Sequence, residues 1–156
     1  MRELNHPSPG AAAACGAEAA SAEAAFVLDA RDARFLTEVG MLAAGRGDVT
    51  QADRVFTFLR RQRPNRAFPL LGLAVARLNA GRALEAARLL REVQLLDPDE
   101  QAVVQSWFGL ALQLAGRCAE SRQVLLKATQ NPGEGGALAR HMLGLAADAT
   151  ENNKGD

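Results

Sequence analysis

The side chains that could bind a metal or transfer a proton are few in this sequence and lie far apart. The chain has two histidines, His6 and His141, and neither has a second histidine at the spacing of a metal-ligand pair. The two cysteines, Cys15 and Cys118, cannot form a disulfide framework and have no ligand partner nearby. We therefore expect no metal site and no cofactor.

Motifs of known catalytic chemistry are also missing from the sequence. The chain contains no tyrosine, no glycine-rich phosphate loop between a strand and a helix, and no G-x-S-x-G elbow. Cys118 follows Gly116 in an expected turn, where it could be a redox-sensitive thiol but where a small apolar filler is the favoured interpretation. The residue inventory predicts that the protein is not an enzyme.

The densest charge cluster is a short run of arginines, namely Arg60, Arg61, Arg63 and Arg66. Arginines of this kind could contact phosphate groups, but at the C-terminal end of a helix they also complement the helix dipole. No aromatic residue interrupts the run, and 18 basic side chains balance 18 acidic ones over the whole chain. A nucleic-acid partner is therefore not expected.

The composition is that of an ordinary globular protein. The 156 residues are 48% hydrophobic and 23% charged, which suits a single domain with a core. No stretch approaches the roughly 18 to 20 apolar residues of a membrane-spanning helix, so membrane insertion is not expected. The segment Met1 to Ala25 has an apolar run too short for a secretory leader, with Glu18 and Glu23 close behind it. Together with the low cysteine content, this predicts a cytoplasmic protein.

One pattern of glycine, small residue, large apolar residue and proline occurs three times. Its members are Gly47, Ala52, Phe56 and Pro64, then Gly81, Ala86, Leu90 and Pro98, then Gly116, Ser121, Leu125 and Pro132. The second copy follows the first by 34 residues at all its positions, which is the period of the tetratricopeptide repeat. The third glycine follows after 35 residues, because one residue is inserted, and the third proline falls one place early. The pattern indicates three copies of one structural unit.

Each copy is interpreted as a pair of antiparallel helices. The small residue lets the two helices approach closely, the glycine ends the first helix and the proline ends the second. Apolar residues at helical spacing, such as Leu36, Val39 and Ala43, support this interpretation. The predicted helices are 33–45, 49–62, 67–80, 83–96, 101–115 and 118–130, with a short N-terminal helix at 21–30 and a capping helix at 137–149. The expected domain covers 21–149, between a disordered alanine-rich tail at 1–20 and a flexible tail at 150–156.

From Phe35 to Pro132 the chain resembles the tetratricopeptide repeat family. The resemblance implies an all-α fold, a right-handed superhelix of about three helical hairpins plus the capping helix, in which the first helix of each hairpin lines a concave groove. The positions that line this groove in the family correspond here to Arg34, Thr37, Met41, Phe68, Leu71, Val75, Leu78, Ser106, Leu110 and Gln113.

Most of these groove residues are apolar, whereas family members that hold the carboxylate tails of chaperones use Lys, Arg and Asn there. The resemblance therefore favours a hydrophobic peptide or an amphipathic helix as the ligand. The competing interpretation is that the same residues only pack against neighbouring helices. The expected partner is another polypeptide, and assembly as a homodimer or a heterodimer stays open.

The size and layout, with the segment from Phe35 to Pro64, also resemble the small tetratricopeptide chaperones of bacterial type III secretion systems. This resemblance implies a cytoplasmic chaperone of a secretion substrate, either a translocator or a needle subunit. Two alternatives remain, a general scaffold or adaptor in another bacterial complex and a regulatory subunit of an enzyme.

Overall fold

The computed structural model describes residues 28–145, and the regular structure there is entirely helical. The helices are α1 (Ala30–Gly45), α2 (Val49–Gln62), α3 (Ala67–Asn79), α4 (Ala83–Arg91), α5 (Pro98–Leu114), α6 (Cys118–Ala128) and α7 (Glu134–Met142). No strand occurs in this range, which confirms the all-α prediction. Within the same residues, no helix combines the length and the apolar character needed to cross a bilayer.

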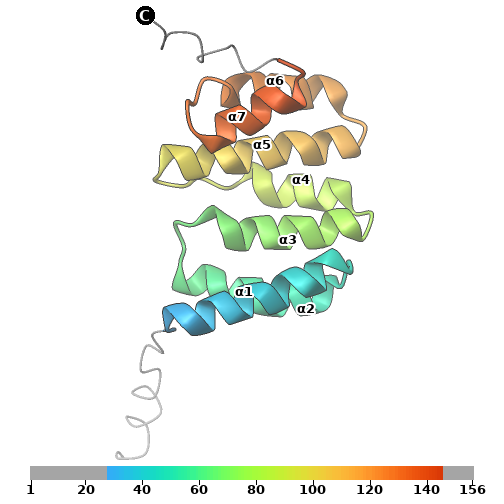
Figure 1. Cartoon of the computed structure of the whole chain (residues 1–156). Coiled ribbons are helices and arrows are strands. Elements are labelled where there is room, and N and C mark those ends of the chain that lie inside the picture. The colour runs from blue at the N-terminus through green and yellow to red at the C-terminus, as the bar shows by residue number, and fades with distance from the viewer. Residues whose placement is uncertain (1–27, 146–156) are drawn as a thin grey trace, which may run out of the picture.

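The helices are stacked in chain order, with α1 and α2 at one end and α6 and α7 at the other (Figure 1). Each helix packs against the next one along the chain. In addition, α1 packs against α3, α3 against α5, and α5 against α7. The odd-numbered helices therefore form one continuous row of contacts through the stack.

The repeated sequence pattern becomes a repeated core. Its large residues, Phe56, Leu90 and Leu125, are each at most 2% exposed. Its small residues are buried as well, namely Ala52, Ala86 and Ser121. Each buried large side chain stabilises the fold by about 1.5 to 3 kcal/mol relative to an exposed one.

The same turn ends every odd-numbered helix of the described chain. It contains a glycine with positive φ, and these glycines are Gly47, Gly81, Gly116 and Gly144. After α1, the amide of Gly47 donates to the carbonyl of Ala44 and the amide of Asp48 donates to that of Ala43, which is the Schellman arrangement. Only glycine adopts this left-handed conformation at little cost. The prediction that Gly47, Gly81 and Gly116 end the first helices is confirmed. Gly144 forms a further turn of the same kind, which the repeated sequence pattern did not include.

Glycines inside the helices bring neighbouring backbones close to Phe56. A Cβ atom placed on Gly40 of α1 would lie 2.9 Å from Cζ of Phe56, and one on Gly72 of α3 would overlap the same ring. In the third hairpin, Gly109 faces Leu125 in the same way. The ring of Phe56 on α2 is therefore enclosed by two helices at positions that have no side chain.

The connection between α4 and α5 differs from the prediction. The helix predicted at 83–96 ends at Arg91, and the next one begins at Pro98 rather than at 101. Gln101 holds the intervening chain, because its Oε1 accepts from the amide of Leu95 at 2.7 Å and its Nε2 donates to the carbonyl of Val93 at 3.2 Å. Pro98 opens the new helix, since the first turn needs no amide donor from it.

Helix α7 lies earlier in the chain than the predicted capping helix at 137–149. It begins at Glu134 and ends at Met142, ahead of the turn at Gly144. Gly135 sits against the backbone of Ala102 and Val103, so a helix can approach α5 at this point without a side chain between them. The glycine-rich segment 133–136, which precedes the predicted helix, therefore contains the N-cap and the first turn of α7.

Several predictions lie outside the described residues. They are the tails at 1–20 and 150–156 and nearly all of the N-terminal helix at 21–30. At the start of the described chain, Leu28 and Asp29 are not helical, and Asp29 is the N-cap of α1.

Candidate functional site

Two neighbouring hollows lie along the row of odd-numbered helices. The first has a volume of about 460 Å³ and lies between α1 and the start of α3. Its lining consists of Ala30, Ala33, Arg34, Thr37, Glu38, Arg63 and Phe68. Three predicted groove residues, Arg34, Thr37 and Phe68, therefore meet in one hollow.

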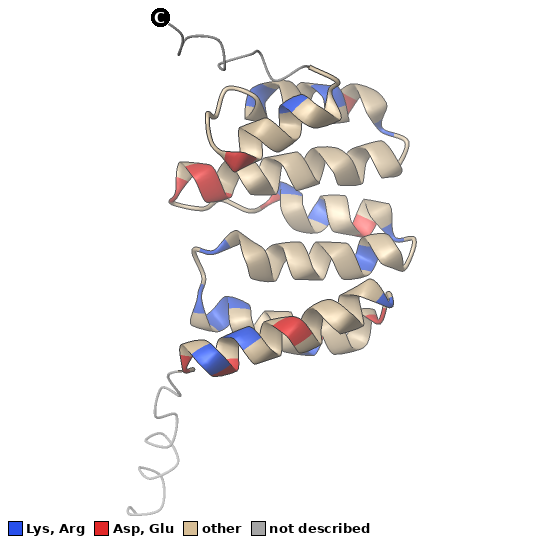
Figure 2. Cartoon of the chain, in the orientation of Figure 1, with Lys and Arg blue, Asp and Glu red and all other residues tan. Residues whose placement is uncertain are grey.

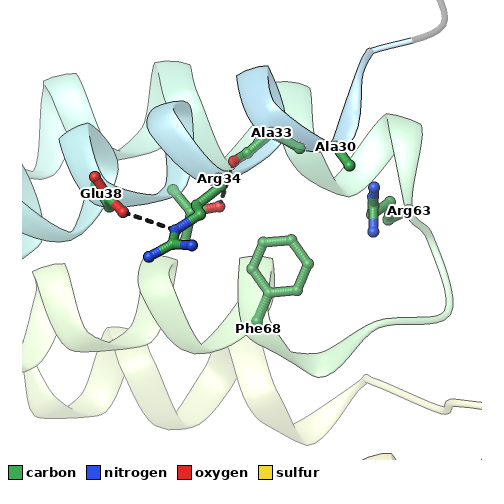
Figure 3. A pocket seen from close by; sticks show the side chains of 7 residues that line it. Ala30, Ala33, Arg34, Glu38, Arg63 and Phe68 are labelled. Carbon is green, nitrogen blue, oxygen red and sulfur yellow. Dashed lines mark hydrogen bonds and ion pairs between the residues drawn. The ribbon is translucent and has the colours of Figure 1, made fainter.

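Phe68 points from α3 toward α1, with Arg34 and Arg63 on either side of it (Figure 3). The guanidinium of Arg34 pairs with Glu38, at 3.2 Å between Nε and Oε1. The hydroxyl of Thr37 donates to the carbonyl of Ala33 at 2.7 Å, one turn back on α1. The hollow thus combines apolar surface from alanines and one phenylalanine with cationic side chains at its edge.

The second hollow, of about 490 Å³, lies between α3 and the starts of α5 and α7. It is lined by Ala67, Phe68, Leu71, Asp97, Asp99, Glu100, Val103, Gly133 and Glu134. Phe68 belongs to both hollows, so it forms their common wall. We call the two hollows together the Phe68 groove.

Glu100 fixes the wall of the Phe68 groove. Helix α3 has no side-chain cap from its own N-cap residue, Arg66. Instead, Oε2 of Glu100 on α5 accepts from the amide of Ala67 at 2.6 Å, while its Oε1 pairs with Nε of Arg66 at 2.9 Å. One carboxylate therefore caps α3 and ties it to α5, directly beside Phe68.

The predicted groove residues in the second half of α3 serve the core. Val75 and Leu78 are half-buried and pack against clusters of buried apolar side chains. Leu71 packs against the core too, but it also lines the second hollow. For Val75 and Leu78, the competing interpretation of packing against neighbouring helices fits the structure better.

The remaining predicted positions are spread over other surfaces. Met41 is 45% exposed on α1 but lines neither hollow of the Phe68 groove. Leu110 is half-buried on α5. Gln113 lines a separate hollow of about 260 Å³, together with Cys118 and Met142. Of the ten residues, Arg34, Thr37, Phe68 and Leu71 line the Phe68 groove, and Gln113 lines the separate hollow.

The prediction that Ser106 contacts a partner is wrong. Its side chain is fully buried, and its hydroxyl donates to the carbonyl of Gly135 at 2.7 Å. The reason is that α7 begins earlier than expected and covers this part of α5. Ser106 therefore serves as a hydrogen-bonded contact between α5 and α7.

No family model, curated protein or solved structure matches this chain. The features of the molecule that bear on function are therefore the repeated hairpins and the chemistry of the Phe68 groove.

The acidic residues of the groove were not predicted from the sequence. Asp97, Asp99 and Glu134 line the second hollow, but none of them occupies a groove position of the repeat family. They lie at or near the beginnings of α5 and α7, where a carboxylate also interacts favourably with the positive end of the helix dipole. The sequence does show acidic residues around Pro98. Whether they border a groove, however, depends on where α7 packs.

The Phe68 groove presents apolar contact surface and charged side chains. Among the described residues there is no group of three or more His, Cys, Asp or Glu side chains that could hold a metal ion. Cys118 is exposed on the separate hollow beside α7, and His141 is exposed in the last turn of α7. What the Phe68 groove provides is an apolar floor bordered by charge.

Proposed function

We propose that this chain is a non-catalytic protein-binding module of the tetratricopeptide type, and that it holds a hydrophobic or amphipathic helical segment of another polypeptide in the Phe68 groove. The observation that carries this proposal is the position of Phe68, a half-buried aromatic ring that forms the common wall of two hollows. Aromatic side chains in such positions are frequent anchors of protein interfaces.

The repeated hairpins support the assignment to the tetratricopeptide type. The glycine that ends the first helix, the small residue at the crossing and the large buried residue recur with the spacing of that repeat. Stacked units of this kind expose an extended surface along their first helices, which suits the recognition of a peptide or a helix.

The layout of the groove suits successive side chains of one bound segment. Two hollows of about 460 and 490 Å³ that share one wall can receive successive apolar side chains of one segment. On a helical ligand, such anchors recur at positions i, i+3, i+4 and i+7. Each anchor that is fully buried contributes about 1.5 to 3 kcal/mol before the cost of association is subtracted.

A narrower proposal concerns the class of partner. The resemblance to the type III secretion chaperones suggests a translocator or needle subunit, held in the cytoplasm before export. This remains a prediction from the sequence. It implies that the secretion substrate stays in solution when it is produced together with this chain and aggregates when the groove is altered.

The test uses two phenylalanines of similar chemistry. Phe68 lines the groove, whereas Phe35 is 65% exposed on α1 and lines neither hollow. We expect Phe68→Ser to lose the partner captured from a lysate of the native host, and Phe35→Ser to keep it. Helical melting of both variants checks that each still folds. Retention of the partner by a folded Phe68→Ser variant would move the binding site elsewhere.

A further inference from the structure

The two ends of the Phe68 groove carry opposite charge. Arg34 and Arg63 line the hollow beside α1, whereas the hollow at the other end is rich in carboxylates. The carboxylates are those of Asp97, Asp99, Glu100 and Glu134. Figure 2 shows basic residues on the connection between α2 and α3 and acidic residues at the starts of α5 and α7.

Pairing within the protein does not remove this difference. At the basic end, Glu38 offsets Arg34, but Arg63 takes part in no ion pair among residues 28–145. At the acidic end, Arg66 offsets Glu100, and no Lys or Arg of the described range 28–145 lines the hollow. The carboxylates that remain there are those of Asp97, Asp99 and Glu134, which are all exposed.

Helix capping accounts for only part of this acidic cluster. Oδ1 of Asp97 accepts from the amides of Asp99 and Glu100, and Oδ1 of Asp99 accepts from the side chain of Asn131 at 3.1 Å. In both residues these hydrogen bonds use one carboxylate oxygen, and the negative charge stays in place. The cluster therefore remains able to attract a cationic side chain that lies over the hollow.

We propose that the segment held in the Phe68 groove is charge-segregated, with acidic residues at the α1 end, apolar anchors over Phe68 and Leu71, and basic residues at the end formed by α5 and α7. This inference rests on the proposed function and specifies the partner of the same site. A segment with this pattern places each terminus against the opposite charge, which fixes the orientation as well as the register of binding.

The experiment compares two fluorescent synthetic peptides on the full-length protein. Both are amphipathic helices with the same composition and the same leucine stripe. In one peptide the glutamates lie at one end and the lysines at the other, whereas in the second they alternate. We expect the segregated peptide to bind roughly tenfold more tightly at low salt and to lose this advantage near 1 M salt.

Charge reversal then tests each end of the groove. Glu134→Lys and Arg63→Glu should each remove most of the advantage of the segregated peptide. The controls are Glu92→Lys and Arg54→Glu, which change the net charge equally at exposed positions outside the groove. These controls should leave the advantage unchanged. An equal loss in the controls would mean that only net charge matters, and this would overturn the proposal.

The outcomes separate this inference from the proposed function. If both peptides bind equally well and Phe68→Ser abolishes both, the groove is the site but charge segregation is wrong. If neither peptide binds, or if a folded Phe68→Ser variant binds both normally, the proposed function itself fails. A benzophenone at the acidic end of the peptide should label residues of α1 or α2, and labelling of α5 or α7 would overturn the orientation.

Discussion

The carboxylate of Glu100 on α5 accepts a hydrogen bond from the amide of Ala67, the first residue of α3, at 2.6 Å. The contact joins residues from two successive hairpins. It satisfies a helix N-terminus that has no side-chain cap of its own. The position of Phe68, the next residue along α3, therefore depends on a side chain from the following repeat.

The first prediction is that Glu100→Ala lowers the free energy of unfolding by about 1 to 3 kcal/mol, because a part-buried amide loses its charged acceptor. Glu92→Ala serves as the control, since Glu92 is exposed at the end of α4 and joins none of the ion pairs within 28–145. Its effect should stay within about 0.5 kcal/mol. Urea denaturation followed by circular dichroism measures both variants. Equal stability of the two would show that Glu100 is not a cap.

The repeat could be predicted from the sequence because its signals are local. Gly47 and Gly81 end helices through their own backbone conformation, and Ala52 is small at the place where two helices cross. These properties belong to single residues at fixed spacing. The helix boundaries at Arg91 and Glu134 differ from the prediction because they depend on specific contacts. Gln101 holds the chain that follows Arg91, and Gly135, next to Glu134, packs against the distant backbone of α5.

The candidate site was harder to predict for the same reason. Ser106 matches a groove position, but α7 covers it through the hydrogen bond to Gly135, which is 29 residues away. Asp99 and Glu134 meet at one hollow only because α7 packs beside α5. Family positions can assign residues to a helix face, but they do not show which part of that face a later helix will cover.

The second prediction concerns the link between α2 and α3. Arg77 donates to both carboxylate oxygens of Asp53, at 2.9 and 3.1 Å, and to the carbonyl of Leu73. We expect Arg77→Ala to destabilise the protein by about 1.5 to 3 kcal/mol, and Arg77→Lys to recover little, because an ammonium group cannot make the paired contact. Thermal melting measures both variants. Full recovery by lysine would mean that only the charge of residue 77 matters.

The third prediction uses two glycines in helices. Gly72→Ala should lower the free energy of unfolding by about 1 to 3 kcal/mol, because the new methyl group overlaps the fully buried ring of Phe56. Gly45→Ala should be neutral or should stabilise by up to about 1 kcal/mol, since a Cβ atom there has no neighbour within 4 Å. Chemical denaturation of the two variants gives the comparison. A stabilising Gly72→Ala would contradict the close approach of α3 to α2.

The fourth prediction concerns the N-terminal tail, which lies outside the described residues. Its composition, rich in alanine with few large apolar side chains, predicts that removal of residues 1–20 leaves the melting temperature almost unchanged. Differential scanning calorimetry of the full and shortened chains tests this expectation. A large decrease would mean that the tail docks on the helical domain, and binding of the peptide probes should then be compared with and without it.

The last prediction separates binding from packing with two leucines of α3. Leu71 and Leu78 are both half-buried and pack against the same core cluster, but only Leu71 lines the Phe68 groove. A glutamate at either position loses apolar contacts and places a charge beside the core. We therefore expect Leu71→Glu and Leu78→Glu to destabilise the protein by similar amounts, about 1 to 3 kcal/mol.

Binding should distinguish these two variants, although stability does not. Measured below the melting transition of both, affinity for the charge-segregated peptide should fall roughly a hundredfold for Leu71→Glu and less than threefold for Leu78→Glu. The physical reason is that the new carboxylate at position 71 lies where an apolar anchor must be buried. At position 78 it lies outside both hollows. Equal loss of binding in the two variants would indicate that the affinity depends on overall stability, and equal retention would place the apolar anchor away from α3.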